Sequence, residues 1–322
     1  MAARNRTMRL SDDEQAQYLA RCLSVTEPVS AEAVLNRTIC GDSFNVLRAL
    51  PRGFADLVIA DPPYNLRRDF GAARFAPLSD ADYAAYTERW LDLVLPLCKE
   101  TASVYVCCDW RTSLIVGPIL ARRLKLRSRI TWQREKGRGA RGNWKNALED
   151  IWFATLSDNY TFHAEAVRQR RRVIAPYRLD GKPRDWSETP EGRFRDTAAS
   201  NFWDDISIPY WSMPENTDHP TQKPEKLLAK LILASSDPGD VVLDPFLGSG
   251  SSAVTAKKLG RRYVGVEQDE RWCALAEKRL ALAETDRAIQ GYTGGVFWER
   301  NTFALQQKAK QREDACHGNE LP

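Results

Sequence analysis

The sequence predicts an α/β fold in which a doubly wound, mostly parallel sheet carries one insertion. Short apolar strands alternate with amphipathic helices over two stretches of the 322-residue chain, residues 38–155 and 225–283. The second stretch contains a strand, a glycine-rich loop, a helix and a strand that ends in an acid, which is the order of a nucleotide-binding unit. Residues 158–213, between the two stretches, show little periodicity and few long apolar runs, so we expect an insertion there, with a solvated, irregular segment as the alternative to a binding region.

Local signals predict the individual elements in order. Ser11 and Glu14 have capping-box spacing and begin a helix that extends to about Cys22. The apolar, β-branched run at 55–60 predicts a buried strand. Further strands are expected at 38–40, 103–108, 127–133, 149–155, 241–244 and 263–267, and further helices at 44–50, 79–97, 112–124, 225–235, 251–259 and 269–283.

The composition is that of an ordinary globular chain, with 43% hydrophobic and 28% charged residues. No segment approaches the roughly 20 apolar residues that a membrane helix needs, and the N-terminal stretch lacks the apolar core of an export signal. We therefore expect a cytoplasmic protein without membrane contact. The seven cysteines are an odd number without C-x-x-C spacing, which favours reduced core thiols and predicts no metal site.

The stretch Asp61-Pro62-Pro63-Tyr64 follows the expected strand at 55–60. Each proline fixes its own backbone and pushes the preceding residue towards extended geometry. Asp61 and the neighbouring carbonyl groups are therefore held on a stiff spur at the carboxyl end of a strand, where open α/β sheets bind ligands. The spur offers acceptors and an aromatic face but no nucleophile, which suits an amine whose protons are held while its nitrogen attacks another group.

The glycine-rich loop follows Asp244 and contains Gly248 and Gly250. Glycines let backbone amides approach a ligand at a helix N-terminus, and Glu267 at the next strand end can take both hydroxyls of a ribose. The same glycine spacing also satisfies the dinucleotide fingerprint, so NAD is an alternative. Against NAD, the Asp244 carboxylate would repel a pyrophosphate, and no second mononucleotide half follows Glu267. A nucleoside that carries an amino acid fits better.

The charge is unevenly distributed along the chain. The formal net charge is only +4, yet between Arg122 and Arg195 there are 19 Lys and Arg residues against 9 Asp and Glu. A basic central segment in a chain whose remaining residues carry net negative charge predicts a localised surface that binds a polyanion.

Three motifs occur in the order DPPYN, HPTQKP and DPFLGSG. They resemble the S-adenosyl-L-methionine-dependent DNA methyltransferases that modify exocyclic amino groups, and more narrowly the beta group, in which the cofactor motif comes last. The resemblance extends from about residue 36 to 280. It implies a Rossmann-like methyltransferase fold, S-adenosyl-L-methionine as cofactor, double-stranded DNA as partner, and activity at the nucleoid of a prokaryote. It leaves a homodimer and a cognate restriction endonuclease open as further partners.

The resemblance also implies roles for individual residues. Asp61, the Pro62 carbonyl and Tyr64, with Pro63 between them, would grip a flipped-out base. Asp42 would approach the adenine of the cofactor, although a Gly-Asp pair before a helix is also an ordinary N-cap. His219 fits a structural role better than that of a base. The cofactor-binding set is Asp42, Asp61, Thr221, Lys223, Asp244, Phe246, Gly248, Ser249, Gly250 and Glu267.

The order of motifs places target recognition between about residues 137 and 213. Arg138, Arg141 and Asn143 lie among flexible glycines and carry the donors and acceptors that read guanine and adenine. The run Arg170, Arg171 and Arg172 is expected to contact phosphates. We expect an N-terminal helical extension (1–35), a catalytic half (36–156), the target-recognition insertion (157–213), a cofactor-binding half (214–290) and a C-terminal tail (291–322).

The predicted activity is methyl transfer to the N6 amino group of adenine in duplex DNA by base flipping. N4-cytosine methylation is the main alternative, because it needs the same grip on an amine; a motif that begins with Asp resembles the adenine enzymes more. A glutamine methyltransferase of release factors would carry its cofactor loop upstream of the Asn-Pro-Pro-Tyr motif, opposite to this chain. A DNA-binding module without catalysis would leave the cofactor loop unexplained.

Overall fold

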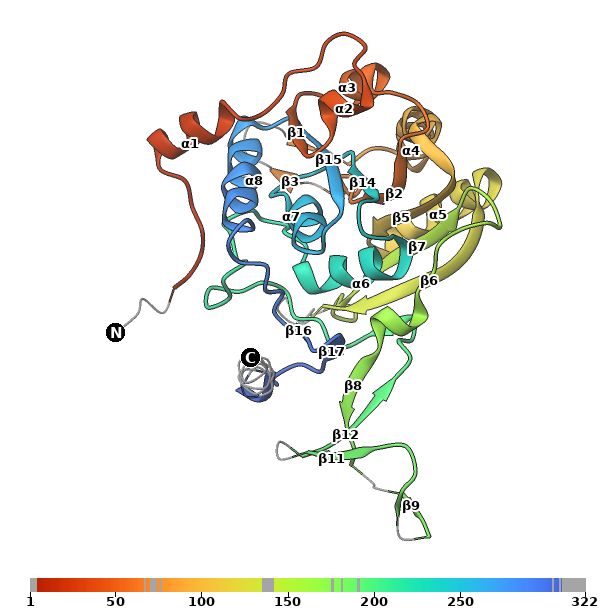
Figure 1. Ribbon diagram of the computed structural model, residues 1–322. Helices are drawn as coiled ribbons and strands as arrows, with labels where there is room; N and C mark the ends of the chain where they lie inside the picture. The colour runs from red at the N-terminus through yellow and green to blue at the C-terminus, as the bar shows by residue number, and fades with distance from the viewer. Residues whose placement is uncertain are drawn as a thin grey trace.

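The computed structural model describes residues 5–66, 68–69, 74–75, 77–134, 142–174, 177–180, 182–189, 192–302, 304–306 and 308. An eight-stranded sheet forms the centre of the molecule (Figure 1). Neighbouring strands run parallel except around β7, which lies antiparallel between β5 and β6. From edge to edge the sheet contains β1 (Arg37–Cys40), β15 (Arg262–Glu267), β14 (Val241–Asp244), β2 (Ala55–Ala60), β5 (Cys98–Cys108), β7 (Leu148–Thr155), β6 (Lys125–Gln133) and β13 (Phe202–Trp203).

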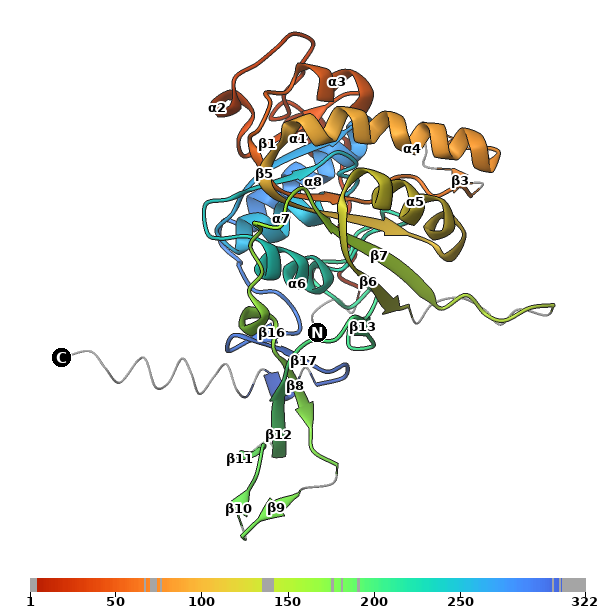
Figure 2. The ribbon, with the colours of Figure 1, turned by 90° about the vertical axis from the view of Figure 1, so that its right-hand side faces the viewer.

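Helices cover both faces of this sheet (Figures 1 and 2). In β2, Val58 and Ala60 pack into one buried cluster with α3, α4 and α5, while Leu57 and Ile59 pack into another with α6, α7 and α8. Alternate residues of the strand therefore face two different cores, which confirms the doubly wound, mostly parallel fold. The helices are α1 (Asp12–Leu19), α2 (Ala31–Val34), α3 (Ser43–Ala49), α4 (Asp80–Val94), α5 (Trp110–Arg123), α6 (Glu225–Ser235), α7 (Ser251–Lys258) and α8 (Glu270–Leu282), with short 3-10 turns at Leu95–Leu97 and Ala164–Val167.

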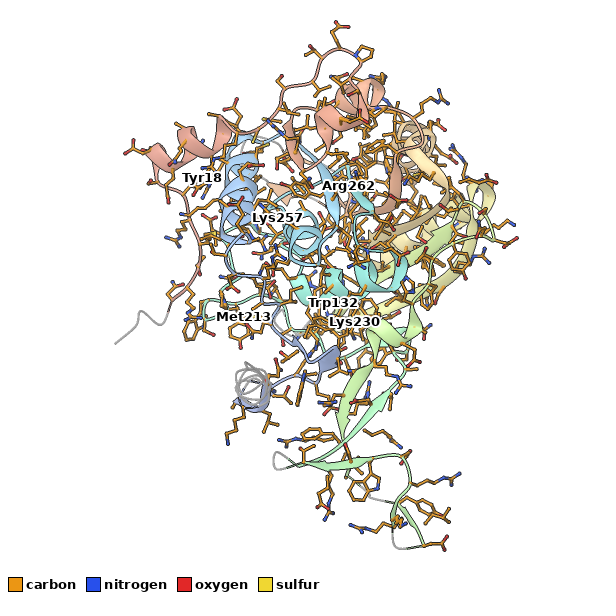
Figure 3. The ribbon with its side chains drawn as sticks, in the orientation of Figure 1. Tyr18, Trp132, Met213, Lys230, Lys257 and Arg262 are labelled. Carbon is orange, nitrogen blue, oxygen red and sulfur yellow. The ribbon has the colours of Figure 1, made fainter. Side chains whose placement is uncertain are left out.

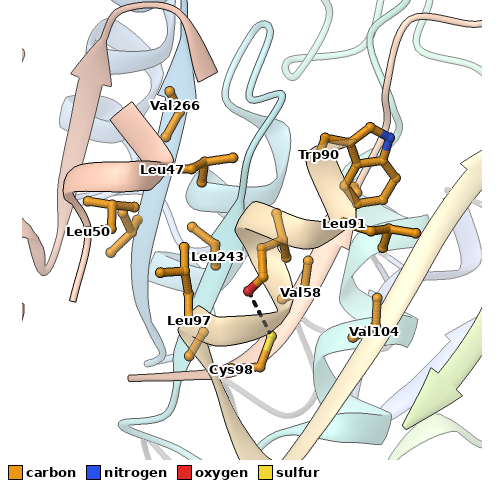
Figure 4. Close-up of a cluster of buried hydrophobic side chains, with 14 of the residues drawn as sticks. Leu47, Leu50, Val58, Trp90, Leu91, Leu97, Cys98, Val104, Leu243 and Val266 are labelled. Carbon is orange, nitrogen blue, oxygen red and sulfur yellow. Dashed lines mark hydrogen bonds between the residues drawn. The ribbon is translucent and has the colours of Figure 1, made fainter. Parts of the chain in front are cut away.

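The first of these cores is shown in Figure 4. Val58, Val104 and Leu243 come from three neighbouring strands and pack with Trp90 and Leu91 of α4. All five side chains are fully buried. This packing holds the carboxyl ends of the central strands at a common edge, where the motifs lie.

The predicted boundaries hold to within a few residues for most central elements because their signals are local, but β5 begins at Cys98 and not at residue 103. β2 spans the predicted residues, and the capping box of Ser11 and Glu14 is formed at the start of α1, although that helix ends at Leu19 rather than near Cys22. The long helix that was expected to reach residue 97 ends at Val94, and a 3-10 turn containing a proline follows it. A proline cannot continue the hydrogen-bond pattern of an α-helix.

The described residues of segment 169–197, which we call the arm, contain strands that the sequence did not predict. A second, five-stranded sheet contains β11 and β12 next to β8, and the arm projects from the body of the molecule (Figure 2). Short, charged strands carry little apolar periodicity, so the sequence showed no strand signal there. The strands concerned are β8 (Gln169–Arg172), β11 (Ser187–Thr189) and β12 (Gly192–Thr197), with two-stranded ribbons of β9 (Arg178–Leu179) and β10 (Lys182–Pro183), and of β3 (Arg68–Asp69) and β4 (Arg74–Phe75).

The other two strands of the second sheet come from the segment expected to be a tail. β17 (Val296–Trp298) pairs in parallel with β8 and in antiparallel with β16 (Tyr292–Thr293). All three residues of β17 are buried. Residues 292–298 therefore belong to the sheet that carries the arm, while the boundaries of the five expected segments stay predictions.

Within the described part of the chain, no helix combines the length and the apolar character that a membrane crossing requires.

Candidate active site

A cavity of about 290 Å³ lies at the carboxyl ends of the central strands. The three sequence motifs line it together, although the first lies more than 150 residues before the other two along the chain. Among the predicted catalytic and cofactor-binding residues, Gly250 is not part of the lining. Those that line the cavity are Asp42, Asp61, Pro62, Pro63, Tyr64, Thr221, Lys223, Asp244, Phe246, Gly248, Ser249 and Glu267.

The spur after β2 is braced by a helix and by a lysine from the HPTQKP motif. The Tyr83 hydroxyl of α4 donates to the Pro63 carbonyl at 3.1 Å. Lys223 Nζ donates to Asp61 Oδ2 at 2.5 Å and to the Tyr64 hydroxyl oxygen at 3.2 Å. The Asp61 carboxylate and the Tyr64 ring are thus held beside each other at the cavity.

Burial and neighbouring charges determine whether the side chains of Tyr64 and Lys223 are ionised. Burial, and after it the negative charges of Asp61 and Glu149, raise the pKa of the Tyr64 hydroxyl well above its ordinary value, so it stays protonated. Burial by itself lowers the pKa of the Lys223 ammonium, but the carboxylates of Asp61 and Glu149 outweigh it and raise that pKa. Lys223 is therefore a buried cation at neutral pH.

Two acids at strand ends, Asp244 of β14 and Glu267 of β15, line the cavity beside the glycine-rich loop. Asp244 Oδ1 accepts from the Phe246 N–H at 2.9 Å, and its Oδ2 accepts from the Ser252 hydroxyl. Glu267 accepts from the Gly248 N–H at 2.8 Å. Burial raises the pKa of Asp244 to about 7 and also raises the pKa of Glu267, because an apolar surrounding disfavours a bare carboxylate. Such acids favour ligands that bring a positive charge or hydroxyl donors.

The glycines of this loop are required by geometry. Gly248 and Gly250 have φ of +54° and +81°, which residues with a side chain rarely adopt. A Cβ at Gly250 would lie 2.6 Å from the Cβ of Ala276 in α8, so this glycine serves close packing of the loop against a helix rather than the cavity.

The HPTQKP segment closes one wall of the cavity. His219 packs edge-on against Trp272 with ring centroids 4.7 Å apart, and its Nδ1 accepts from the Thr221 N–H at 3.4 Å. A Cβ at Gly248 would meet the His219 ring at 3.2 Å, so the histidine lies directly against the glycine-rich loop. Burial lowers the pKa of His219 to about 4, and the ring is neutral at neutral pH. This is the structural role expected from the sequence.

Asp42 is the N-cap of α3 and also lines the cavity, while its role towards the adenine of the cofactor stays a prediction. Its side chain accepts from the Asn45 N–H at 3.1 Å. The adjacent Ser43 hydroxyl donates to the Pro245 carbonyl at 2.6 Å, which ties this end of β1 to the glycine-rich loop.

The sequence reasoning missed Glu149 and Arg134. Glu149 is buried near the start of β7, with 4% of its surface exposed, and its Oε2 accepts from the Tyr64 hydroxyl at 3.4 Å and lies 3.4 Å from Lys223 Nζ. Its other oxygen forms an ion pair with Arg134, which follows β6. An acid at the start of an apolar strand was the signal available, but only the antiparallel pairing of β6 and β7 brings the two residues to the site.

Of the residues predicted to contact DNA, those that the structure describes do not line this cavity. Asn143 is exposed, and Arg138 and Arg141 lie outside the described residues. In β8, Arg170 forms two hydrogen bonds with the Asp196 carboxylate, at 2.8 and 2.7 Å. The neighbouring Arg172 side chain is exposed, and Arg171 Nη2 lies 3.5 Å from Asp204 Oδ1. Their roles stay predictions.

Comparison with known proteins agrees with the motifs. A family model described as DNA methylase, of the N6 and N4 type, matches residues 55–278. The chain is 30% identical over 247 residues to the type II methyltransferase M.HpaI of Haemophilus parainfluenzae, covering 76% of this chain and 74% of that protein. It is also 30% identical over 256 residues to the DNA adenine methyltransferase YhdJ of Escherichia coli (strain K12), covering 76% and 82%.

Solved structures share the fold. PvuII DNA methyltransferase (cytosine-N4-specific) superposes with a TM-score of 0.56 at 16% identity, covering 81% of this chain and 92% of the other. TTHA0409 of Thermus thermophilus, solved in complex with S-adenosyl-L-methionine, superposes with a TM-score of 0.53 at 20% identity, covering 83% and 98%.

The family match extends over more than half of the chain, and it includes both the proline spur and the glycine-rich loop. The family uses S-adenosyl-L-methionine, so the predicted class of enzyme and its cofactor are confirmed. The family includes enzymes that act on adenine N6 and on cytosine N4, and therefore does not by itself define the target base. The chain belongs to the family of DNA methylases that transfer methyl groups to amino groups of bases.

Proposed function

We propose that the protein methylates the N6 amino group of adenine in double-stranded DNA. The observation that carries this proposal is that Asp61 and Tyr64 of the proline spur line the same cavity as the acids Asp244 and Glu267. The motif begins with Asp, as in the adenine enzymes that it resembles. The similarity to a DNA adenine methyltransferase over most of the chain supports the same base.

The residues of the cavity fit S-adenosyl-L-methionine. Asp244 is buried with a raised pKa and would gain from the ammonium group of the methionine part, and Glu267 would take the ribose hydroxyls. When bound, the cofactor supplies an electrophilic methyl group on a sulfonium.

The proline spur would bind the second reactant, the target adenine. The amino nitrogen of adenine is a poor nucleophile because its lone pair is delocalised into the ring. Asp61 and the Pro62 carbonyl would accept its two hydrogens, which favours a pyramidal nitrogen with an available lone pair. Tyr64 would stack on the extruded base, a contact worth about 1–3 kcal/mol, which offsets part of the cost of base flipping, a few kcal/mol. Positioning and charge placement would supply the catalysis, without a covalent intermediate.

The test is to express the protein in cells that lack DNA methylation and to measure methylated nucleosides in their DNA by mass spectrometry. We expect N6-methyladenine. N4-methylcytosine in its place would overturn the choice of base and leave the family assignment intact. Sequencing the methylated positions defines the target site, and recovery of a cognate restriction endonuclease or of a dimer would test the remaining expected partners.

The role of Asp61 is tested with Asp61→Ala. We expect no detectable methyl transfer, with affinity for S-adenosylhomocysteine within a few-fold of the unchanged protein, because Asp61 would act on the base. The matched control is Asp56→Ala, at an acid in the preceding strand that pairs with Lys99 outside the cavity. Near-normal turnover by Asp61→Ala would remove the proposed role.

A further inference from the structure

The ammonium group of Lys223 occupies the position beside Asp61 where the proposed reaction needs the amino group of the target nucleobase. Lys223 Nζ is 2.5 Å from Asp61 Oδ2 and 3.2 Å from the hydroxyl oxygen of Tyr64. It lies 5.3 Å from the centroid of the Tyr64 ring, at the hydroxyl end of that ring. The internal amine thus holds the carboxylate oxygen of Asp61 that the amino group of adenine would use. That amino group cannot take this position at Asp61 Oδ2 while the ammonium stays there.

Moving the ammonium away from all carboxylates would be costly. Only 9% of Lys223 is exposed, and a buried charge without a partner is strongly disfavoured. Glu149 Oε2 lies 3.4 Å from the ammonium, and the ion pair with Arg134 holds the other Glu149 oxygen in place. The four-carbon stem of lysine allows a short swing between two carboxylates.

We propose that Lys223 occupies the amine-binding position of the spur in the base-free enzyme, and that Glu149 receives its ammonium when a base amino group displaces it from Asp61. This inference rests on the proposed function. Glu149 would be a positioning residue, since it acts through Lys223 and does not touch the base. The exchange moves no covalent bond, and Lys223 keeps its proton throughout.

Lys223 therefore competes with the amino group of the nucleobase for Asp61, and the strength of this competition depends on Glu149. With Glu149 present, the ammonium has a second carboxylate to move to, so the cost of releasing Asp61 is small. In Glu149→Gln, the ammonium has Asp61 as its remaining carboxylate partner in the corner and competes directly with the base. In Lys223→Met the competitor is absent.

The experiment compares two duplexes that carry the mapped target site, one with adenine and one with purine, which lacks the exocyclic amine. Binding of each is measured at equilibrium with saturating S-adenosylhomocysteine, whose affinity is determined separately for every variant by calorimetry. The ratio of the affinity for the adenine duplex to that for the purine duplex measures how strongly the enzyme binds the exocyclic amine. We expect Glu149→Gln to lower this ratio about tenfold, the size of effect that loss of a charge-assisted hydrogen bond produces.

The double variant Glu149→Gln with Lys223→Met separates this inference from a merely structural role. We expect it to regain the preference for adenine, because no ammonium competes for Asp61. The matched control Asp150→Asn removes the neighbouring acid of β7, which accepts from Thr131 in β6, and should leave the ratio unchanged. A folding defect would weaken both duplexes alike and would not change their ratio.

An unchanged ratio in Glu149→Gln, or a double variant that does not regain it, would overturn the inference. If mass spectrometry shows that the enzyme modifies cytosine, the duplex pair becomes cytosine and 2-pyrimidinone, and the exchange is tested in the same way. If the unchanged protein binds neither S-adenosylhomocysteine nor DNA, the proposed function fails and this inference fails with it.

Discussion

Asp244 is a buried carboxyl whose charge depends on pH in the physiological range. Burial raises its pKa to about 7, against the hydrogen bonds from Ser252 and the Phe246 N–H, which favour the ionised form. An ammonium ligand needs the ionised form. The pocket therefore combines a dry environment with a carboxylate that is only partly charged at neutral pH in the absence of ligand.

We predict that the affinity for S-adenosylhomocysteine rises as pH increases from about 6 to 7.5, because Asp244, with its pKa raised to about 7, ionises over this range. Asp244→Asn should bind more weakly and should lose this pH dependence. Calorimetric titrations at several pH values measure both effects. Asp42→Asn, at another acid of the same cavity, is the control and should keep the rise.

The same residue affects folding stability with a definite sign. Its pKa in the folded state lies above the ordinary value of 3.8, so the folded protein binds the proton more tightly than the unfolded chain does. The stabilising contribution of that proton is complete below pH 3.8 and is lost as pH rises through about 7. We therefore expect the free energy of unfolding of Asp244→Asn to depend less on pH between about 4 and 7 than that of the unchanged protein, as urea denaturation would show.

At the scale of elements, the start of α7 depends on close packing against α8. An added Cβ at Gly250 would lie 2.6 Å from the Cβ and 2.9 Å from the Cα of Ala276, whereas nothing lies within 4 Å of one at Gly239. Both glycines have positive φ, +81° and +89°. The two positions share the backbone strain and differ in the clash.

We predict that Gly239→Ala lowers the free energy of unfolding by about 1 kcal/mol, from backbone strain alone. Gly250→Ala should cost roughly a further 1–3 kcal/mol, because overpacking is added to the strain. Urea denaturation of both variants measures the difference. Equal losses would mean that α8 moves aside without cost.

The arginines of β8 in the arm differ in whether their side chains are available to contact DNA. Arg170 is engaged with Asp196 and its guanidinium lies 5.2 Å from the ring centroid of Trp298, so it stabilises the sheet of the arm. Arg172 is exposed on the same strand.

We predict that Arg172→Ala flattens the slope of log affinity against log salt by about 0.9, the value for one phosphate contact. Arg170→Ala should leave this slope nearly unchanged and should lower the stability of the protein. DNA binding measured over a series of salt concentrations tests both variants. A slope that changes for Arg170→Ala and not for Arg172→Ala would reverse the assignment of the two residues.

At the scale of the whole molecule, a buried charge cluster joins the body to the sheet of the arm. Lys226 and Lys230 of α6 lie 2.6 and 2.7 Å from the Asp205 carboxylate (Figure 3 labels Lys230). Lys230 also lies over the rings of Trp203 and of Phe297 in β17. Burial lowers the pKa of Lys226 to about 8, so this lysine depends on Asp205 to stay charged.

We predict that Asp205→Ala destabilises the protein by about 3–5 kcal/mol, because it leaves two buried ammonium groups without this carboxylate. Asp204→Ala is the matched control, since the side chain of Asp204 is 43% exposed and its pairing with Arg171 is a surface contact worth less than about 1 kcal/mol. Thermal and urea unfolding measure both. A small loss for Asp205→Ala would show that the lysines become neutral or reach water.

The body of the fold could be predicted because its signals are local. The β-branched run of β2, the capping box at Ser11 and the caps at Ser79 and Asp269 each act within a few residues of themselves. The same is true of the proline spur, whose stiffness comes from consecutive prolines. For this reason the motif residues could be expected at one sheet edge from the sequence alone.

The features of the fold and of the site that the sequence did not predict depend on contacts between distant segments. β17 pairs with β8 across more than 100 residues, and Glu149 faces Lys223 only because β7 reverses direction beside β5. Strand pairing of this kind leaves no local trace in a short, charged or isolated strand. The sequence was sufficient to predict the class of enzyme, the succession of central strands and helices along the chain, and most of the residues that line the cavity. Tertiary contacts were needed to show which charges meet in the cavity and that residues 292–298 complete the sheet of the arm, since long-range pairing selects among many partners that local sequence leaves equivalent.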